Sequence, residues 1–508
     1  MSAAKVRAMA RDPRADVDIA ADTDSPSATM LAIRNALKLG ASLVFTWGIA
    51  LAIRLLLPRY LGPIRFGTLS FADGFTSASF IVLGLGAEAY IRKEVTVRPS
   101  HASDFFGGTF VLRIVLTALI LAAMYAVLRS TGRPGDVCGV VMIYGLTQFF
   151  VNANATFSAM LHAKGRVGAM SVLAVATKIV WAVGILIAMV RGAGLWAYAA
   201  SYLASESVET VVLWALARRH LGLKFRVEIA ATRAMLLASL PYYLTLFATT
   251  AYGKLDVSLL EFMGSTEEVG WYGAANAVAG LTLLATPLIG WVLMPMFARA
   301  AARSQEEFYE QIRRSMELVL TVAIPAGLVL YLGADVWVRF LFGAAFAPAA
   351  MALRVLAPMF VLMYVSIIYS IALVMLERAW TQTLIAMVGL VVNVILNLVL
   401  IRFSMRAFGP GGGGKGCSLA MLGTEIVVSG CMIAVVGRGG FDRRGVATVL
   451  KSLLACAVAV AAHGALARIG PLRLLVDAIV YTSLVLATGA LRLREMVAIA
   501  REAIRRRE

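Results

Sequence analysis

Apolar runs of roughly 20 residues, separated by short polar breaks, repeat along nearly the whole chain. An α-helix of about 20 apolar residues crosses the ~30 Å hydrocarbon core of a bilayer, so each run predicts one membrane span. Fourteen runs are found, which predicts an all-α polytopic membrane protein with about 14 transmembrane helices. The predicted spans are residues 32–57, 69–91, 106–128, 137–161, 167–190, 194–216, 234–253, 270–296, 318–340, 352–375, 380–402, 417–436, 447–467 and 474–491.

Short segments of the first half of the chain recur, in the same order, in the second half. "RFGTLSFADGF", from Arg65, is matched by "EVGWYGAANAV", from Glu268, and "MLHAKGRVGAM", from Met160, is matched by "MLERAWTQTLI", from Met375. The glycine that precedes the sixth span is matched by one before the twelfth. Spans 1–6 and 7–12 are therefore expected to form two pseudo-symmetric six-helix lobes inserted the same way up, followed by two C-terminal helices.

This repeat sets the expected domains. Residues 31–220 form an N-lobe, residues 221–437 form a C-lobe, and residues 438–508 hold the last two spans and a basic cytoplasmic tail. Residues 1–30 are mixed in charge and poor in apolar residues, which predicts a disordered cytoplasmic tail. They contain no apolar stretch followed by a small-residue cleavage site, so no signal peptide is expected.

The turn after the first span of each lobe has an unusual composition. The first of these turns, "PRYLGPIRFGTLSFADG", is expected to reverse the chain tightly at the outer surface. Its glycines supply backbone freedom and close helix approach. Phe66 and Trp271–Tyr272 are expected at the membrane–water interface, where aromatic residues are enriched. We therefore interpret both turns as structural landmarks and not as catalytic loops.

Composition agrees with a membrane protein. The chain is 60% hydrophobic and only 15% charged, with a mean hydropathy of +0.82, whereas soluble domains average about 25% charged residues. The net charge of +18 comes mostly from Lys and Arg in loops on one side. This pattern predicts that both termini are cytoplasmic. The expected partner of the basic loops is the anionic inner leaflet and not nucleic acid.

No enzyme chemistry is evident. None of the four histidines is paired at ligand spacing, and the four cysteines (Cys138, Cys417, Cys431, Cys456) lack metal-site spacing and suit small buried positions. The glycine-rich stretch "GPGGGGKGCS", 409–418, is interpreted as an outer loop, and it lacks the features of a phosphate-binding loop. We therefore expect no catalytic residue, no metal site and no cofactor. Energy would come from an ion gradient, the membrane potential or the substrate gradient.

Ionisable residues inside predicted spans are costly and therefore mark functional candidates. Arg54, Arg113 and Lys178 are candidates to line an aqueous cavity that attracts an anionic head group. The alternative is that these side chains snorkel to the membrane surface or form ion pairs between helices.

Acidic and amide side chains in other spans are candidates for ion coupling. Asp256 at the end of span seven, with Asn393 and Asn397 in span eleven, offers oxygen ligands that suit Na⁺ or a relayed proton. The alternative for the asparagines is hydrogen bonding between helices. Glu206 and Glu209, at i and i+3, are a candidate proton-carrying pair, or else partners of Lys178. In addition, Ser304 and Glu307 form a capping box that predicts the start of a cytoplasmic helix.

Three of these segments carry a family resemblance. "LPRYLGPIRFGTLSFADGF", "KLDVSLLEFMGSTEEVGWYGAANAV" and "VNVILNLVLI" resemble bacterial polysaccharide flippases of the O-antigen and exopolysaccharide type. These flippases belong to the multidrug/oligosaccharidyl-lipid/polysaccharide exporter superfamily. The resemblance covers residues 31 to about 437 and the number of spans.

The resemblance implies a fourteen-helix, two-lobe transporter with a cationic central cavity. Such a protein flips an undecaprenyl-pyrophosphate-linked oligosaccharide from the inner to the outer leaflet by alternating access, with ion coupling in several members. Cavity arginines of the family would correspond to Arg54 or Arg34, and cation-site positions to Asp256, Asn393 and Asn397. A polysaccharide polymerase is an implied partner.

Other functions remain open at this point. An ion-coupled multidrug exporter predicts an acidic cavity, and drug exporters of this superfamily usually have twelve spans. A lipid II flippase of the same superfamily has an acidic and aromatic first turn, which this chain lacks. A membrane scaffold without transport activity is the third alternative.

Overall fold

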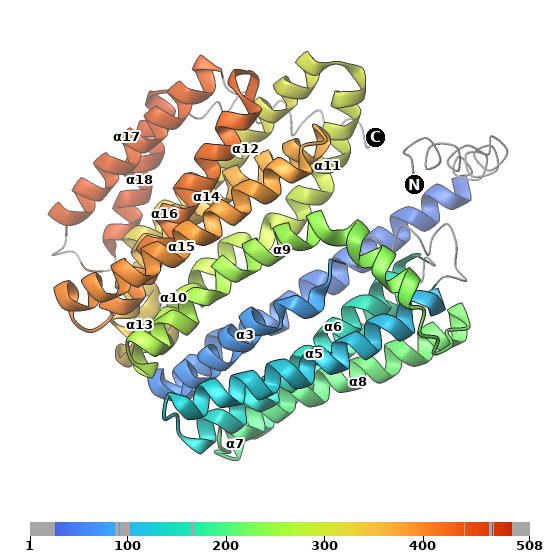
Figure 1. The fold of residues 1–508 in the computed structure, drawn as a ribbon. Helices are drawn as coiled ribbons and strands as arrows, with labels where there is room; N and C mark the ends of the chain where they lie inside the picture. Colours follow the sequence, from blue (N-terminus) through green and yellow to red (C-terminus); the bar gives the residue numbers. More distant parts are fainter. Residues whose placement is uncertain are drawn as a thin grey trace.

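Figure 1 shows the chain as a bundle of long helices in two halves. The computed structural model describes residues 26–86, 91, 102–163, 167–440, 442–466, 470 and 472–489. Within these ranges the chain forms helices joined by short turns, and no strand occurs. The predicted all-α class is therefore confirmed. Residues 1–25 of the predicted N-terminal tail and residues 490–508 of the predicted C-terminal tail lie outside the described residues. Residues 26–30, which were expected to be disordered, form the first residues of helix α3.

The first half of the chain contains α3 (Pro26–Ser79), η1 (Phe80–Gly84), α5 (Ala102–Ser130), α6 (Gly135–Ala163), α7 (Val167–Val190) and α8 (Leu195–Leu221). The second half contains α9 (Ile229–Met263), α10 (Thr266–Ala279), η3 (Gly280–Ala285), α11 (Thr286–Arg303), α12 (Gln305–Leu332), α13 (Ala334–Phe342), η4 (Ala344–Phe346), α14 (Ala349–Met375), α15 (Ala379–Phe408), α16 (Gly412–Val436), η5 (Arg438–Gly440), α17 (Arg443–Ala465) and α18 (Arg473–Ala487).

Nine helices in the described part of the chain are long and apolar enough to cross a membrane, and α9 makes a tenth if its bent halves count as one span. Predicted span one and residues 69–84 of predicted span two lie in the α3–η1 stretch, of which Phe45–Gly84 alone is 40 residues long. Span eight is divided among α10, η3 and α11, while spans six and fourteen correspond to α8 and α18. Each of the fourteen predicted segments thus falls largely on helix.

The long helix α3 changes direction at Gly62. The backbone there has φ 74° and ψ 172°, so two helices meet at a kink. Positive φ is readily adopted only by glycine, and Pro58 and Pro63 on either side further disfavour a straight helix. The predicted turn after the first span therefore exists. We call the end of the bundle that holds this kink the Gly62 end, and the opposite end, where α12 begins, the Ser304 end.

A second break occurs in each half, where the second span becomes a short 3₁₀ helix. In the first half the break is η1, followed by Leu85 and Gly86 with positive φ. In the second half it is η3, between α10 and α11. The repeat detected in the sequence thus extends to the interruption of equivalent helices, and each interruption frees backbone carbonyls for other partners.

Figure 1 shows the helices α3–α8 in one half of the bundle and α10–α16 in the other, with α9 beside both. The expected lobe bounds, residues 31–220 and 221–437, stay a prediction. Within the first half α6 packs along α8 and α3 along α7; within the second, α16 packs against α14 and α15. Helix α9 contacts α3 and α5 of the first half as well as α15 of the second, and it bends by 63° between Leu240 and Tyr243. Helices α17 and α18 pair with each other and lie against α12.

The two C-terminal helices are tied to the second half at the Gly62 end. The carboxylate of Asp335 accepts from Arg354 of α14 at 2.6 Å and from Arg473 of α18 at 2.8 Å. Burial alone would raise the pKa of Asp335, but the backbone hydrogen bond, Arg354 and Arg473 hold this pKa below its ordinary value. The ion pairs therefore persist at neutral pH and are lost only in acid, as the pH falls through that lowered pKa.

The predicted helix start at Ser304 is confirmed, but only one of the two capping-box bonds forms, because the Glu307 carboxylate binds Arg303 instead. The hydroxyl of Ser304 accepts a hydrogen bond from the backbone N–H of Glu307 at 3.1 Å. The helix that begins there runs without interruption into predicted span nine and ends at Leu332, earlier than expected. Residues 334–342 instead form the separate short helix α13.

The two halves meet most closely where α3 crosses α10, near the Gly62 end. A Cβ atom at Gly67 would lie 1.9 Å from the carbonyl oxygen of Thr266, and one at Gly270 would lie 2.0 Å from that of Pro63. The backbones of the two helices are therefore in direct contact. We call this contact the glycine crossing.

The aromatic residues of the repeated turns pack in this region instead of at the membrane surface. Phe66 and Trp271 are each 8% exposed and Tyr272 is fully buried. The indole of Trp271 donates to the carbonyl of Ala345 at 2.8 Å. The expectation that these side chains lie at the membrane–water interface is therefore wrong, because they fill the space around the glycine crossing.

The glycine crossing predicts a position-specific effect of adding one methyl group. Gly67→Ala should lower the free energy of unfolding by about 1–3 kcal/mol, because the new Cβ must displace the Thr266 carbonyl. Gly48→Ala in the same helix is the matched control, since no atom lies within 4 Å of its Cβ position. Thermal unfolding of both purified variants measures the difference. Equal stability of the two variants would contradict the direct backbone contact.

Candidate transport site

A cluster of charges lies between the two halves at mid-depth. The ammonium of Lys254 on α9 is 2.9 Å from the carboxylate of Asp73 on α3. Arg54, also on α3 and exposed, is close enough for its charge to act on Asp73. Asp73 lies 11 residues after Gly62 and Arg54 lies 8 residues before it, roughly 16 and 12 Å along the helix at 1.5 Å per residue. We call these three residues the central charge cluster.

The central charge cluster is partly accessible. The side chains of Lys254 and Asp73 are 35% and 38% exposed. Two cations and one carboxylate leave one net positive charge at the depth where an ionised group in hydrocarbon is most costly. Such charges are tolerated where they pair with one another or face a water-filled cavity. Lys254 and Asp73 are paired and partly accessible, and Arg54 adds a cation beside them. The chemistry of this cluster suits an anionic group that competes with Asp73 for Lys254 and Arg54.

Two tyrosines extend the polar surface from the cluster into the first half. The rings of Tyr144 on α6 and Tyr202 on α8 lie with centroids 5.6 Å apart, and both are within electrostatic range of Asp73. Aromatic faces with a polar tip are adaptable surfaces for a ligand with both polar and apolar parts.

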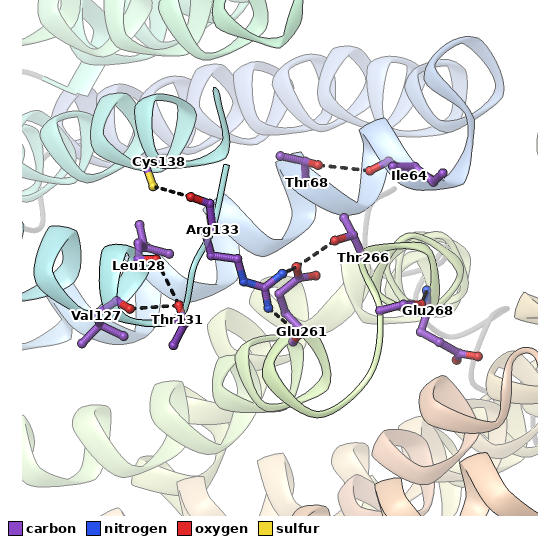
Figure 2. A network of polar contacts seen from close by, with 11 residues as sticks. Ile64, Thr68, Val127, Leu128, Thr131, Arg133, Cys138, Glu261, Thr266 and Glu268 are labelled. Atoms are coloured by element: carbon purple, nitrogen blue, oxygen red, sulfur yellow. Dashed lines mark hydrogen bonds and ion pairs between the residues drawn. The ribbon is translucent and has the colours of Figure 1, made fainter. Parts of the chain in front are cut away.

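The Gly62 end is closed by a bridge between the halves (Figure 2). Arg133, in the turn between α5 and α6, binds the carboxylate of Glu261 on α9 at 2.5 Å and the carbonyl of the same residue at 2.7 Å. Thr266 donates to the same carboxylate at 2.8 Å. The guanidinium also lies over the rings of Phe71 and Phe262, at 5.9 and 5.6 Å from their centroids. We call this contact the Arg133–Glu261 bridge.

A second carboxylate near this end organises a helix start. Glu268 on α10 accepts hydrogen bonds from the backbone N–H of Gly411 at 2.6 Å and of Gly414 at 3.1 Å. It therefore lies at the N-terminus of α16, where unpaired N–H groups and the helix dipole favour a negative charge. The expectation that the glycine-rich stretch 409–418 is an outer loop is therefore wrong in part. From Gly412 onward this stretch is the buried beginning of α16.

Among the predicted cavity residues, Arg54 lies in the central charge cluster and Arg113 does not. Arg113 is 3% exposed. Its Nε donates to the carbonyl of Leu83 in η1 at 3.0 Å and its Nη1 to the hydroxyl of Thr156 at 2.6 Å. The guanidinium thus holds the broken second span against α5 and α6. Arg34 lies in α3, but its side chain is outside the described residues.

Lys178 lies with the two predicted glutamates between α7 and α8. Its ammonium is over the ring of Trp181 at 5.3 Å, and its charge acts on Glu206. Glu206 accepts from the side-chain amide of Asn154 at 3.0 Å, and Glu209 accepts from the hydroxyl of Thr177 at 3.0 Å. The structure therefore brings Lys178, Glu206 and Glu209 into one polar network inside the first half, separate from Arg54.

The predicted ion site is divided into two parts. Asp256 is fully buried and accepts from the backbone of Val257 at 2.8 Å and from the hydroxyl of Tyr272. Asn397 donates to Asn393 at 3.0 Å. Neither amide hydrogen-bonds to Asp256, although α9 and α15 pack together. The Oδ1 atom of Asn397 is buried without a hydrogen-bond partner, so this part of the site has a free acceptor.

Metal-binding side chains do not gather in the described part of the chain: no group of three or more His, Cys, Asp or Glu occurs there. Asn393 donates to the hydroxyl of Thr424 at 3.2 Å, which leaves amide and hydroxyl oxygens as the available hard ligands beside Asn397. Such oxygens suit an alkali-metal ion or water better than a transition metal.

Sequence reasoning missed the two contacts between the halves. Asp73 and Lys254 are 181 positions apart, and Arg133 and Glu261 are 128 positions apart. Asp73 was visible as a carboxylate inside a predicted span and Lys254 as an ammonium directly after the predicted end of another, which is a signal for pairing. Arg133 and Glu261 fall in short breaks at span ends, where charged residues are common and give no such signal.

Comparison with known proteins gives one family match. The model of the family described as "Polysaccharide biosynthesis protein" matches residues 32–301, which is more than half of the chain. A probable low-salt glycan biosynthesis flippase, Agl15 of Haloferax volcanii, is 21% identical over 372 residues. That alignment covers 72% of this chain and 77% of the relative.

Solved structures share the fold at low sequence identity. The lipid II flippase MurJ in an inward closed conformation superposes with a TM-score of 0.70 at 14% identity, over 92% of this chain and all of that chain. An inward-facing multidrug resistance MATE transporter of the MOP superfamily gives 0.58 at 16% identity, over 77% and 92% of the two chains. The Vibrio cholerae MATE transporter VcmN gives 0.53 at 15% identity, over 82% of this chain and all of that one. The fold is therefore that of this transporter superfamily.

The Arg133–Glu261 bridge predicts a stability cost for removing its cation. Arg133→Ala should lower the free energy of unfolding by about 2 kcal/mol, because the Glu261 side chain is 1% exposed and loses its counter-ion. This loss of stability is smaller than for a fully buried ion pair, because the Arg133 side chain is 21% exposed and water can partly replace it. Adding Glu261→Gln should recover part of it, since the unpaired charge is then gone.

Arg129→Ala is the control, because this arginine is exposed one turn earlier on α5. Chemical or thermal unfolding of the single and double variants measures the coupling. An Arg133→Ala variant as stable as Arg129→Ala would show that the bridge contributes nothing to the closed end.

Proposed function

The chain belongs to the polysaccharide biosynthesis family, and from this premise we propose that it is a flippase for a lipid-linked oligosaccharide. The substrate we infer is an undecaprenyl-pyrophosphate-linked oligosaccharide, moved from the inner to the outer leaflet of the bacterial inner membrane by alternating access. The single observation that carries this proposal is the central charge cluster between the halves. The name of the Haloferax volcanii relative agrees with such a role.

The physical problem is the passage of a charged, hydrated head group through hydrocarbon. A pyrophosphate and several sugars cannot shed their water in the bilayer core, whereas the polyprenyl tail is already soluble in lipid. A cationic, partly hydrated surface at mid-depth lowers the barrier for the head group alone. Arg54 and Lys254 would bind phosphate oxygens, with Asp73 holding Lys254 in place until the substrate arrives.

Closure at the Gly62 end fits the state of such a transport cycle in which the outer face is shut. With the Gly62 end outside and the Ser304 end in the cytoplasm, the glycine crossing and the Arg133–Glu261 bridge shut the outer face. Opening to the outside then requires separation at both contacts. Both termini would lie in the cytoplasm, as the excess of Lys and Arg in the loops of that side predicts.

Ion coupling is assigned to the buried oxygen-bearing side chains. The free Oδ1 of Asn397, with Asn393 next to it and the buried Asp256 on the neighbouring helix, offers ligands for Na⁺. Glu206 and Glu209 are the alternative, as proton carriers in the first half. A polysaccharide polymerase would take up the flipped product on the outer side.

This proposal predicts that charge in the cluster matters for transport more than for folding. Lys254→Ala and Arg54→Ala should each reduce flipping about tenfold or more, because a charge-assisted bond to phosphate contributes about 1.5–3 kcal/mol. Stability should change by less than about 1 kcal/mol, since the Lys254–Asp73 pair is partly exposed. Flipping of a labelled undecaprenyl-pyrophosphate-linked oligosaccharide in proteoliposomes is the measurement.

Arg402→Ala, an exposed arginine on α15, is the control and should flip at the wild-type rate. Unchanged flipping in both cluster variants would contradict the assignment of the head-group site. The same vesicles separate the other functions: drug-stimulated proton flux indicates a multidrug exporter, flipping of lipid II alone indicates that branch, and neither activity indicates a scaffold.

A further inference from the structure

The broken second span of each half is supported in different ways. In the first half the carbonyl of Leu83 in η1 accepts from Arg113 of α5, whose side chain also reaches Thr156 of α6. That long side chain is 3% exposed and occupies the space between the break and the two helices next to it. The first half is therefore filled at this position by protein.

The second half has the same helices in the same order around η3, but the cavity-lining residues of α12 include no counterpart of Arg113. The carbonyl of Thr282 accepts instead from the hydroxyl of Tyr364 on α14. Three of the residues with which α12 lines this space are small: Ala323, Ala326 and Gly327. As a result a cavity of about 300 Å³ remains between η3, α11, α12 and α14.

The lining of this cavity is almost entirely hydrocarbon. Apart from Thr282 and Tyr364, whose carbonyl and hydroxyl are bonded to each other, its side chains are aliphatic or aromatic, including Ile289, Phe360 and Val361. An apolar space with no free polar partner holds no stable water and takes up apolar ligands. A charged or sugar-bearing ligand finds no hydrogen-bond partner there.

The mouth of the cavity identifies the occupant. Leu318 and Val322 of α12 line the cavity and are 56% and 61% exposed. Helix α12 is long and apolar enough to span the membrane, and it packs against α11, α14 and α17. Exposed aliphatic side chains on the spanning part of such a helix face bilayer hydrocarbon. The opening therefore leads from the cavity into the acyl-chain region of the membrane.

We propose that this cavity is a lipid site, which binds one acyl chain of a bilayer phospholipid between η3, α11, α12 and α14. The chain supplies the packing contacts that Arg113 supplies in the first half. The acyl chain packs against η3 and so supports the broken span. This interaction does not depend on the transported substrate. The site is independent of the proposed function and of the central charge cluster.

The test uses the full chain in vesicles that contain phosphatidylethanolamine with a photoreactive diazirine on one acyl chain. After illumination, labelled peptides are mapped by mass spectrometry. We expect labelling concentrated on the cavity-lining residues of α12 and α14. Val322→Trp places a bulky side chain in the mouth of the cavity. We expect it to weaken binding of the acyl chain about tenfold and to reduce this labelling accordingly. Val329→Trp, 47% exposed on the same helix but outside the cavity, should leave labelling unchanged.

Ala326→Phe is a second variant, which fills the cavity from within and decides the question if Val322→Trp does not fold. Gel filtration and the unfolding temperature establish the folded state of each variant. Three results would overturn the proposal: labelling of α12 and α14 retained in the folded Val322→Trp or Ala326→Phe variant, labelling lost equally in Val329→Trp, or labelling by a photoreactive polyprenyl phosphate and not by the phospholipid. The last result would show that the cavity binds an isoprenoid chain.

Discussion

The contact on which the rest of the structure depends is the glycine crossing between α3 and α10. At Gly67 and Gly270 the backbones of the two halves touch, and any larger side chain would separate them. Because Phe66, Trp271 and Tyr272 pack around this contact, it is dry, and the Arg133–Glu261 bridge closes its edge. A tight, small-residue contact is stabilised by short-range packing, so it is lost abruptly when the helices move apart. This property suits an interface that must exist in two states.

Farther from the Gly62 end, the contact between the same two halves is made by charged side chains and not by close packing. Lys254 and Asp73 are paired across the halves and still a third exposed, with Arg54 nearby. Ion pairs of this kind contribute little to stability, so we relate their presence in the membrane-spanning part of the bundle to the anionic ligand that we propose they bind. In the proposed function, a pyrophosphate would replace Asp73 as the partner of Lys254 and Arg54, which would weaken one link between the halves as it forms new ones.

The sequence was sufficient for those features that repeat or have a characteristic length. Apolar runs located the fourteen helical segments, and the alignment of Phe66–Gly67 with Val269–Gly270 located the crossing without showing that the two sites touch each other. The sequence was insufficient to predict contacts between distant positions, such as that of Asp73 with Lys254. The glycine-rich stretch before α16 was misjudged because its helix start depends on Glu268, 143 positions earlier. Arg113 appeared to be a ligand residue because its actual partner, the freed carbonyl of Leu83, exists only once the second span breaks.

The most direct test of this account is a disulfide across the glycine crossing. In a background without the four native cysteines, Ser70→Cys and Gly273→Cys bring two thiols within reach, since a Cβ at Gly273 lies 3.2 Å from that of Ser70. Flipping of the labelled lipid-linked oligosaccharide is then measured in proteoliposomes before and after reduction. The account predicts no flipping while the disulfide is intact and recovery when it is reduced. Undiminished flipping by the fully cross-linked protein would contradict the claim that the two halves separate at this contact.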